Sequence, residues 1–383
     1  MTPRRVLHCH STFAPGGKEL RAVRLMNAFG RAAHHVVLSG VPDALGARDA
    51  IAPDLIVDFP QDAPSLRGRP SWSRYRTLAR YMQGFDLILT YNWGAMDAVA
   101  ARRFFPGDGP PLIHHEDGFN ADEAHRQRLG RMLFRRAMLP AAAQIIVPSR
   151  QLYEIARALW KCPAAQLVQI PNGIDTRRFA APAEMGQVPG FQRHTDDIVI
   201  GTIAGLRPVK NLARLIRAVA ALPGAVRLVI VGEGPDRAAL MEAAHKHGMA
   251  DRLVLPGHLP EPHRYIGHFD IFALSSDSEQ APLALIEAMA AGRPVVATLV
   301  GDVGHMVAPE NLPWLVAPSD EAGFTAALQA LCHDPDLRAR LGRANQDKAR
   351  AAYDEADMIQ RYADIYGFAD PKPADPRFSR GSG

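Results

Sequence analysis

The chain alternates between short apolar runs and longer stretches in which apolar residues recur with helical spacing. In the first half, the runs that predict strands lie at residues 4–10, 35–39, 55–57, 86–90, 112–114 and 145–149. The stretches that predict helices lie at residues 20–29, 96–104 and 151–159. Strands and helices that alternate in this way form βα units and a parallel sheet, whose ligands bind beyond the carboxyl ends of the strands.

The same pattern begins again after residues 180–195, a stretch rich in Pro, Gly and Ala without periodicity. Such a stretch indicates a linker. Beyond it, strands are predicted at residues 198–201, 228–231, 253–255, 271–274 and 295–297, and helices at 321–332, 336–349 and 350–367. The pattern therefore predicts an α/β protein with two doubly wound parallel-sheet domains that face each other across a cleft.

We assign residues 1–178 to the first domain, 179–196 to the linker and 197–349 to the second domain. A final helix covers residues 350–368, and the Pro-containing tail, 369–383, is expected to be disordered. A chain of 383 residues is long enough for two hydrophobic cores.

Composition favours a folded globular protein, because 47% of the residues are hydrophobic. There is no run of about 20 apolar residues that would span a membrane. The first strand is too short and too polar for a secretion signal. Cys9, Cys162 and Cys332 are odd in number and far apart, which favours reduced thiols and a cytoplasmic location.

Charge is distributed unevenly along the chain. Residues 1–180 hold 24 Lys and Arg against 15 Asp and Glu, whereas the remainder holds 20 against 25. A basic half suggests an anionic partner such as phospholipid or a polyphosphorylated substrate, although an Arg-rich composition would give the same count. Residues 127–139 form a basic amphipathic helix that suits either the inner face of an anionic membrane or ordinary solvation. Its arginines are Arg128, Arg131, Arg135 and Arg136.

Several catalytic classes lack their motifs. No GxxxxGK[ST] phosphate loop is present, and Gly232-Glu233-Gly234-Pro235 lacks the third glycine of a dinucleotide-binding fingerprint. His258, His263 and His268 are spaced by five residues, which is not a metal-ligand spacing. The serines that follow apolar runs, Ser149 and Ser275, lack the setting of a nucleophile elbow. We therefore interpret the three histidines as non-ligands.

The stretch from Ser276 to Gly292 carries the strongest chemical signal. Pro282 is expected at the first position of a helix and Gly292 at its end. Within this almost wholly apolar helix lies Glu287, whose charge requires polar partners if it is buried. Glu279 precedes the helix, whose amino-terminal N–H groups attract anions.

A second signal lies between a strand and a helix, in Ala204–Asn211, where Arg207 and Lys210 occupy a turn. Two fixed cations beside a helix N-terminus can stabilise a leaving diphosphate. Gly16 and Gly17 occupy a corresponding strand-to-helix turn in the first half, where glycine permits a close approach of backbone to ligand.

Together these motifs resemble the retaining glycosyltransferases of family 4 (glycosyl transferases group 1), which have the GT-B fold. The resemblance covers residues 4–366 and rests on motifs that occur in the family's order: Gly16-Gly17, Ile170–Asp175, Arg207 with Lys210, Gly232-x-Gly234-Pro235, and Glu279-x7-Glu287 followed by Ala288–Ala297. It implies two Rossmann-like domains and a last helix that crosses back to the first.

The resemblance also implies roles for individual residues. Glu287 would bind the ribose hydroxyls of the donor nucleotide, and Glu279 the hydroxyls of its sugar. Arg207, Lys210 and the amides near Pro282 would stabilise the diphosphate without a metal. The resemblance thus implies a nucleotide-diphosphate sugar as co-substrate and neither a metal nor another cofactor. The donor-binding set is Gly16, Gly17, Arg207, Lys210, Gln280, Ala281, Pro282, Leu283 and Glu287, and the catalytic candidates are Glu279, Lys210, Arg207 and Asp117.

This chain departs from the family pattern at three places. Gly205 stands where many members have an additional Arg, so either Arg207 takes that cation's role or the cation is missing. Gln280-Ala281-Pro282 replaces the usual Gly-Phe-Gly, and Asp117 aligns with a His that contacts sugar. The candidates for acceptor or sugar contacts are Lys18, His115, Glu116 and Asn172.

The resemblance implies transfer of a sugar from a nucleotide-diphosphate sugar, with retention, to a glycan or lipid-linked acceptor in cell-surface polysaccharide or glycolipid biosynthesis. Two alternatives remain open at this point. Another GT-B activity, such as a sugar-nucleotide epimerase, would convert the donor without an acceptor. A non-catalytic sugar-nucleotide binding protein would bind the donor without turnover.

Overall fold

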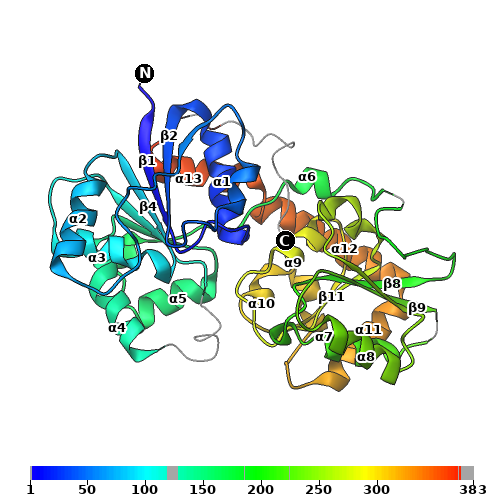
Figure 1. Ribbon diagram of the computed structural model, residues 1–383. Helices are drawn as coiled ribbons and strands as arrows, with labels where there is room; N and C mark the ends of the chain where they lie inside the picture. Colours follow the sequence, from blue (N-terminus) through cyan, green and yellow to red (C-terminus); the bar gives the residue numbers. More distant parts are fainter. Residues whose placement is uncertain (1, 119–127, 185, 224, 370, 372–383) are drawn as a thin grey trace. The chain divides into compact units, whose positions relative to one another are not determined.

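The computed structural model describes residues 2–118, 128–184, 186–223, 225–369 and 371, and divides into two compact units (Figure 1). Unit 1 extends to Pro171 and includes the carboxyl-terminal segment from Ala356, while unit 2 extends from Asn172 to Glu355. The division falls at Pro171, so residues 172–178 and the stretch assigned to the linker belong to unit 2. No described helix is both long enough and apolar enough to cross a membrane.

Unit 1 is built around a seven-stranded parallel sheet with the strand order β3-β2-β1-β4-β5-β6-β7. Its strands are β1 (Arg4–His10), β2 (Ala33–Ser39), β3 (Ile56–Asp58), β4 (Leu87–Tyr91), β5 (Leu112–His115), β6 (Gln144–Val147) and β7 (Leu167–Gln169). The central strands are apolar because both faces of the sheet are covered.

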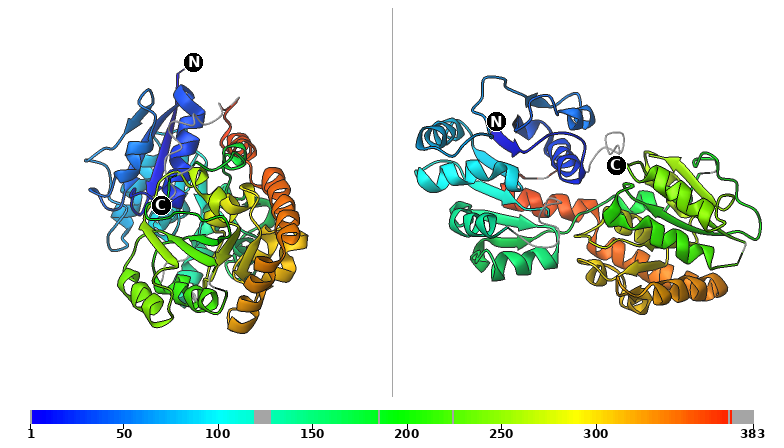
Figure 2. Two further views of the ribbon diagram at one scale, coloured as in Figure 1. Left: turned by 90° about the vertical axis from the view of Figure 1, so that its right-hand side faces the viewer. Right: turned by 60° about the horizontal axis from the view of Figure 1, so that its bottom comes forward.

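Helices cover the two faces of this sheet in separate layers, and Figure 2 shows these layers from two further directions. One face packs against α2 (Trp72–Met82), α3 (Met96–Phe104), α4 (Leu129–Met138) and α5 (Arg150–Ala158). The other face packs against α1 (Gly17–Phe29) and α13 (Glu355–Tyr366). The predicted helix 127–139 corresponds to α4, and its first residue, Gln127, lies outside the described residues.

Unit 2 has a six-stranded parallel sheet with the order β10-β9-β8-β11-β12-β13. Its strands are β8 (Ile198–Ile203), β9 (Val226–Val231), β10 (Leu253–Gly257), β11 (Ile271–Leu274), β12 (Val295–Thr298) and β13 (Leu315–Val316). Its helices are α6 (Thr176–Phe179), α7 (Leu212–Ala220), α8 (Arg237–Lys246), α9 (Leu283–Ala290), α10 (Val303–Met306), α11 (Glu321–His333) and α12 (Pro335–Ala352).

Both sheets reverse their strand order at one point, between β1 and β4 in unit 1 and between β8 and β11 in unit 2. At such a point neighbouring strands send their helices to opposite faces, which leaves a ligand site beyond their carboxyl ends. The βα loops of β8 and β11 carry Lys210 and Glu279 respectively, so strand order brings these two residues together.

The boundary between the last two helices differs from the expected one, which lay between residues 349 and 350. Helix α12 continues to Ala352, and α13 begins at Glu355. The break between them pairs with Ile174, whose N–H donates to Tyr353 O and whose carbonyl accepts from Glu355 N–H. Tertiary pairing therefore fixes a helix boundary that local sequence did not reveal.

Candidate functional site

The turn after β9 packs closely against the turn after β8. A Cβ atom on Gly232 would lie 1.9 Å from Ala204 O, and one on Gly234 would lie 2.3 Å from Leu206 O. Both glycines also have positive φ angles, which side chains disfavour. The Gly-x-Gly sequence thus has a packing role, because it supports the turn that carries Arg207.

Lys210 ends a short 3₁₀ helix, Pro208–Lys210, that leads through the left-handed residue Asn211 into α7. Its amine donates a hydrogen bond of 2.6 Å to Glu279 Oε1, and the Ser276 hydroxyl donates to the same oxygen, also at 2.6 Å. The two charged side chains are 16% and 9% exposed. The other Glu279 oxygen, Oε2, has no hydrogen-bond partner in the described part of the chain, so this carboxylate can bind Lys210 and a ligand hydroxyl together.

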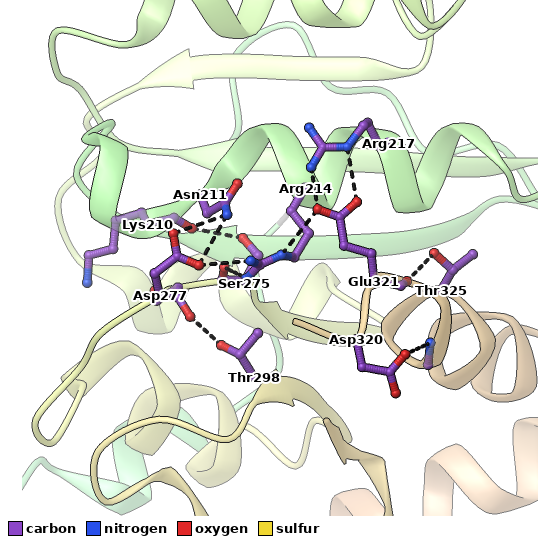
Figure 3. Close-up of polar contacts among 12 residues, drawn as sticks. Lys210, Asn211, Arg214, Arg217, Ser275, Asp277, Thr298, Asp320, Glu321 and Thr325 are labelled. Atoms are coloured by element: carbon purple, nitrogen blue, oxygen red, sulfur yellow. Dashed lines mark hydrogen bonds and ion pairs between the residues drawn. The ribbon is translucent and has the colours of Figure 1, made fainter. Parts of the chain in front are cut away.

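The two loops that carry this pair are joined by short hydrogen bonds (Figure 3). Ser275 Oγ donates to Lys210 O at 3.0 Å, and Asp277 N–H donates to Val209 O at 2.8 Å. The Asn211 side-chain amide donates to both Asp277 carboxylate oxygens, at 3.2 and 3.1 Å. The loop after β11 is therefore fixed against the loop after β8.

Helix α9 begins at Leu283, with Pro282 as the preceding capping residue rather than the first helical residue. No side chain caps this helix N-terminus, so its first N–H groups remain available to an anion. The loop after β12 packs against the residues that precede α9. A Cβ atom on Gly301 would lie 2.2 Å from Glu279 O, and Asp302 N–H donates to Gln280 O at 3.0 Å.

Glu287 lies on α9 and is 4% exposed, so its carboxylate is buried. Burial, reinforced by the charge of Glu287, raises the pKa of the Tyr265 hydroxyl.

Arg207 is exposed, in contrast to Glu287, and its side chain makes no hydrogen bond or ion pair within the described residues. Its guanidinium folds over Gly205, where a Cβ would lie 3.3 Å from Arg207 Nε. The missing side chain at position 205 leaves room for this cation.

In unit 1, Gly16 precedes α1 and Gly17 begins it, so both lie at the helix N-terminus as the sequence predicted. Glu19 folds back toward this terminus, because its Oε2 lies 2.8 Å from the position of a Cβ on Gly16. Lys18 pairs with Glu19. Burial lowers the pKa of Lys18 to about 8, with the Asp117 charge acting in the opposite direction and Arg21 in the same one.

Asp117 pairs with Arg21, a residue that the sequence reading did not select. Arg21 lies on α1 and donates to Asp117 Oδ1 at 2.5 Å. Burial, the largest single influence, acts to raise the pKa of the Asp117 carboxyl, but the charge and hydrogen bond of Arg21, together with the His115 and Lys18 charges, lower that pKa overall. The signal in the sequence was a charge on the inward face of a largely apolar helix, the same signal that identified Glu287.

The structure places His115 and Glu116, which were predicted as acceptor or sugar contacts, in the interior of unit 1. His115 is buried, with Nε2 2.7 Å from the hydroxyl of Tyr366 and Nδ1 3.1 Å from Thr90 O. Glu116 is also buried and accepts a hydrogen bond of 3.2 Å from Arg135 Nε. His115 is the last residue of β5 and Glu116 follows it directly, and both side chains lie in the core.

Asn172 lies in unit 2, at its first residue, and is half-buried. Of the predicted residues in unit 2, Lys210 and Glu279 bond each other in the loops after β8 and β11, Arg207 lies in the first of these loops, and Glu287 lies within α9. Gly16, Gly17, Lys18 and Asp117 lie at the corresponding edge in unit 1.

Two family models match the chain, and together they span most of it. Residues 15–178 match the model "Glycosyltransferase Family 4", and residues 188–348 match "Glycosyl transferases group 1".

Curated relatives include the lipopolysaccharide core biosynthesis glycosyltransferase LpsD of Rhizobium meliloti, which is 27% identical over 49% of this chain and 54% of the relative. The putative glycosyltransferase EpsD of Bacillus subtilis is 29% identical over 51% and 52%. The D-inositol 3-phosphate glycosyltransferase of Nocardia farcinica is 30% identical over 66% and 55%. The chain thus spans about half the length of these relatives.

Solved structures match along almost the whole chain. Anabaena HepE in complex with UDP has a TM-score of 0.78 at 20% identity, covering 95% of this chain and 99% of that one. Sucrose-phosphate synthase from Thermosynechococcus elongatus has a TM-score of 0.75 at 21% identity, covering 95% and 98%. At this level of identity the likeness shows the fold, which is GT-B. With both family models matched in order and this fold, the chain belongs to the group 1 glycosyltransferases of family 4.

Proposed function

We propose that the protein transfers a sugar from a nucleotide-diphosphate sugar to a glycan or lipid-linked acceptor, with retention of configuration and without a metal. The observation that carries this proposal is the Lys210–Glu279 pair beside the uncapped N-terminus of α9. A cation, a carboxylate with one unused oxygen and a helix N-terminus suit a ligand that combines diphosphate with sugar hydroxyls.

Each part of the donor has a counterpart in this arrangement. Lys210, Arg207 and the first N–H groups of α9 bind the diphosphate, on which negative charge develops as it leaves. Glu279 Oε2 accepts a hydrogen bond from a sugar hydroxyl, while Oε1 keeps Lys210 in place. Glu287 accepts hydrogen bonds from the ribose. Gln280, Ala281 and Leu283 contribute the loop and helix backbone around the sugar.

In the transfer, the bond between the anomeric carbon and the diphosphate oxygen breaks, and a bond from that carbon to the acceptor oxygen forms. The acceptor hydroxyl gives up its proton, and the diphosphate leaves with the bonding electron pair. Stabilisation of that leaving charge by one fixed donor typically contributes about 2.7–4 kcal/mol. Lys210 supplies such a contact.

Acceptor binding is proposed for unit 1, at the edge formed by Gly16, Gly17, Lys18 and Asp117. Lys18 remains partly exposed and has a pKa of about 8, lowered chiefly by burial, so much of it is charged at neutral pH. Asp117 presents a carboxylate oriented by Arg21. A cation beside a carboxylate suits a hydroxylated acceptor.

A panel of donors tests the function. Anabaena HepE binds UDP and UDP-glucose, so UDP-sugars are the first probes, followed by GDP- and ADP-sugars in a thermal-shift screen. Donors that stabilise the chain are then incubated with glycan and lipid-linked acceptors. Acceptor-dependent release of nucleoside diphosphate supports a transferase. Donor conversion without acceptor would instead identify an epimerase, and binding without turnover a non-catalytic binding protein.

Peripheral association with an anionic membrane, on the cytoplasmic side, is a proposal about location and partner. The outer surface of α2, α3 and α4 exposes the apolar side chains of Trp72, Phe104, Leu129 and Leu133. These helices contain several arginines, whereas their acidic residue, Asp97, already pairs with Arg74. Exposed Trp and Leu beside Arg suit the interface of an anionic bilayer.

Flotation with vesicles of phosphatidylglycerol and phosphatidylcholine tests the membrane proposal. Binding should require the anionic lipid and weaken with salt. Trp72→Ser with Leu129→Ser should reduce it, while Met241→Ser with Leu312→Ser, which removes exposed apolar side chains from unit 2, should not. Equal flotation of all variants, or none of the wild type, would contradict the proposal.

A further inference from the structure

Arg214 is a buried cation on α7 that the donor assignment does not use. Its side chain is 8% exposed. Its guanidinium donates to Ser275 O at 2.9 Å and to Asp277 Oδ1 at 2.8 Å. Both partners lie in the loop after β11, between the strand and Glu279. Arg214 thus joins the helix that follows Lys210 to the loop that precedes Glu279.

Glu321, the first residue of α11, holds the other side of this guanidinium. Its carboxylate oxygen Oε1 lies 3.7 Å from Arg214 Nε and forms an ion pair with Arg217 Nη2 at 2.6 Å. Figure 3 shows Arg214 between Asp277 and Glu321, with the Lys210 side chain directed away from it. No hydrogen bond or ion pair joins Arg214 to Lys210 or Glu279, so any influence on them passes through the loops.

We infer that Arg214 and Asp277 are positioning residues, which set the separation between Lys210 and Glu279 by fixing their two loops together. The expected effect on kcat rests on the proposed transferase function. The expected effect on the Lys210–Glu279 hydrogen bond does not. Asp277 connects to the loop after β8, through its N–H to Val209 O and its carboxylate to Asn211, and to α7 through Arg214. The Arg214–Asp277 bond joins two charged groups, whereas each of the other bonds between these loops, from Ser275 Oγ to Lys210 O, from Asp277 N–H to Val209 O and from the Asn211 amide to Asp277, has at least one neutral partner.

The geometry explains why a planar guanidinium occupies this position. Two N–H groups of one guanidinium reach two acceptors, Ser275 O and Asp277 Oδ1, in a fixed relative direction. A lysine amine is a point charge on a flexible stem and fixes neither direction as strongly. A misplacement of about 1 Å in a reacting group can cost roughly a hundredfold in rate.

The test compares Arg214→Ala with Arg217→Ala as the matched control. Arg217 lies on the same helix and pairs with the same Glu321, but it makes no bond to the loop of residues 275–277. In crystal structures without ligand, the Lys210–Glu279 hydrogen bond should be lost in Arg214→Ala and kept in Arg217→Ala. A pair that stays intact in Arg214→Ala would overturn the inference, whether or not the chain is a transferase.

Kinetics with UDP-glucose, or with the donor that the screen selects, tests the consequence. Arg214→Ala should lower kcat about tenfold or more, with little change in donor KM, because the contact strengthens in the transition state. Arg214→Lys and Asp277→Asn should each recover part of kcat relative to the alanine variants. Arg217→Ala should keep the wild-type kcat.

The double variant Lys210→Ala/Arg214→Ala separates positioning from stability. If Arg214 acts through Lys210, the double variant should turn over at the rate of Lys210→Ala alone. A further fall of similar size in that background, or a loss of kcat explained by a smaller folded fraction in circular dichroism, would overturn the inference. Absence of any wild-type turnover would count against the proposed function, and the crystallographic comparison would still decide the positioning role.

Discussion

The Lys210 amine lies 2.6 Å from Glu279 Oε1, so the cation and the carboxylate proposed for diphosphate and sugar are bonded to each other before any ligand arrives. Ser276 bonds the same oxygen. A ligand therefore meets a side-chain pair whose directions are already fixed, and the cost of ordering two long side chains falls on folding rather than on binding. Preorganisation of this kind favours charge stabilisation during the reaction.

Lys210→Ala tests the diphosphate contact. It should lower kcat by more than tenfold, because one preorganised contact to developing charge contributes about 2.7–4 kcal/mol. The measurement is initial-rate release of nucleoside diphosphate. Lys246→Ala, a substitution of an exposed lysine on α8, is the control and should match the wild type. Unchanged turnover in Lys210→Ala would rule out this assignment.

Gly232→Ala tests the support beneath Arg207. The new methyl group would meet Ala204 O at 1.9 Å, and the residue has a φ of 144°. We expect a loss of about 3 kcal/mol in the free energy of unfolding of unit 2, measured by urea denaturation. Gly248→Ala is the control, because Gly248 also has a positive φ but no atom within 4 Å of its Cβ position. That variant should lose only about 1 kcal/mol, and an equal loss in both would show that the close approach is unimportant.

His10→Phe tests the buried histidines of unit 1. Burial lowers the pKa values of His35 and His115 to about 3 and those of His8 and His10 well below their usual value. The unfolded chain, with values near 6.5, binds more protons than the folded chain below that pH. Stability should therefore be fully present above about pH 7 and fall as the pH decreases toward about 3.

Neither ring nitrogen of His10 has a hydrogen-bond partner in the described structure, and its ring stacks on Tyr91 at 4.0 Å. Phenylalanine keeps this stacking and removes one titrating group, so the slope of stability against pH should decrease by up to about 1.4 kcal/mol per pH unit. The measurement is urea denaturation between pH 4.5 and 8. His247→Gln, at an exposed site, should leave the slope unchanged; a slope that His10→Phe does not alter would contradict the prediction.

Arg135→Met tests whether this arginine belongs to the interior rather than to the basic surface of α4. Arg135 is 1% exposed, lies about 5 Å from the rings of Trp93 and Trp160, and bonds the buried Glu116. Removing the cation beside a buried carboxylate should cost about 3–5 kcal/mol in the free energy of unfolding. Arg136→Met, at the exposed neighbouring position, should change it by less than about 0.5 kcal/mol.

The double variant Arg135→Met/Glu116→Leu completes this experiment. Because it removes both buried charges, its loss should be smaller than that of Arg135→Met alone. A loss equal to the sum of the two single variants would show that the pair is not coupled.

The sequence predicted the alternation of strands and helices well, because strands covered on both faces appear as continuous apolar runs. It also selected Lys210, Glu279 and Glu287, since a charge next to or within an apolar helix requires an explanation. It did not reveal the burial of His115, the last residue of β5, or of Glu116, which follows it. The structure shows that both are buried, one against Arg135 and the other against Tyr366.

By itself, then, the sequence determined the α/β class, the order of the elements and the residue types that can hold a diphosphate and a sugar. Tertiary structure alone decided which charges are partners. Lys210 bonds Glu279, Arg214 bonds Asp277 and Arg21 bonds Asp117, across sequence separations of 69, 63 and 96 residues. The physical reason is strand order. Only the placement of β8 beside β11, and of β4 between β1 and β5, brings those loops within the few ångströms over which hydrogen bonds and ion pairs form.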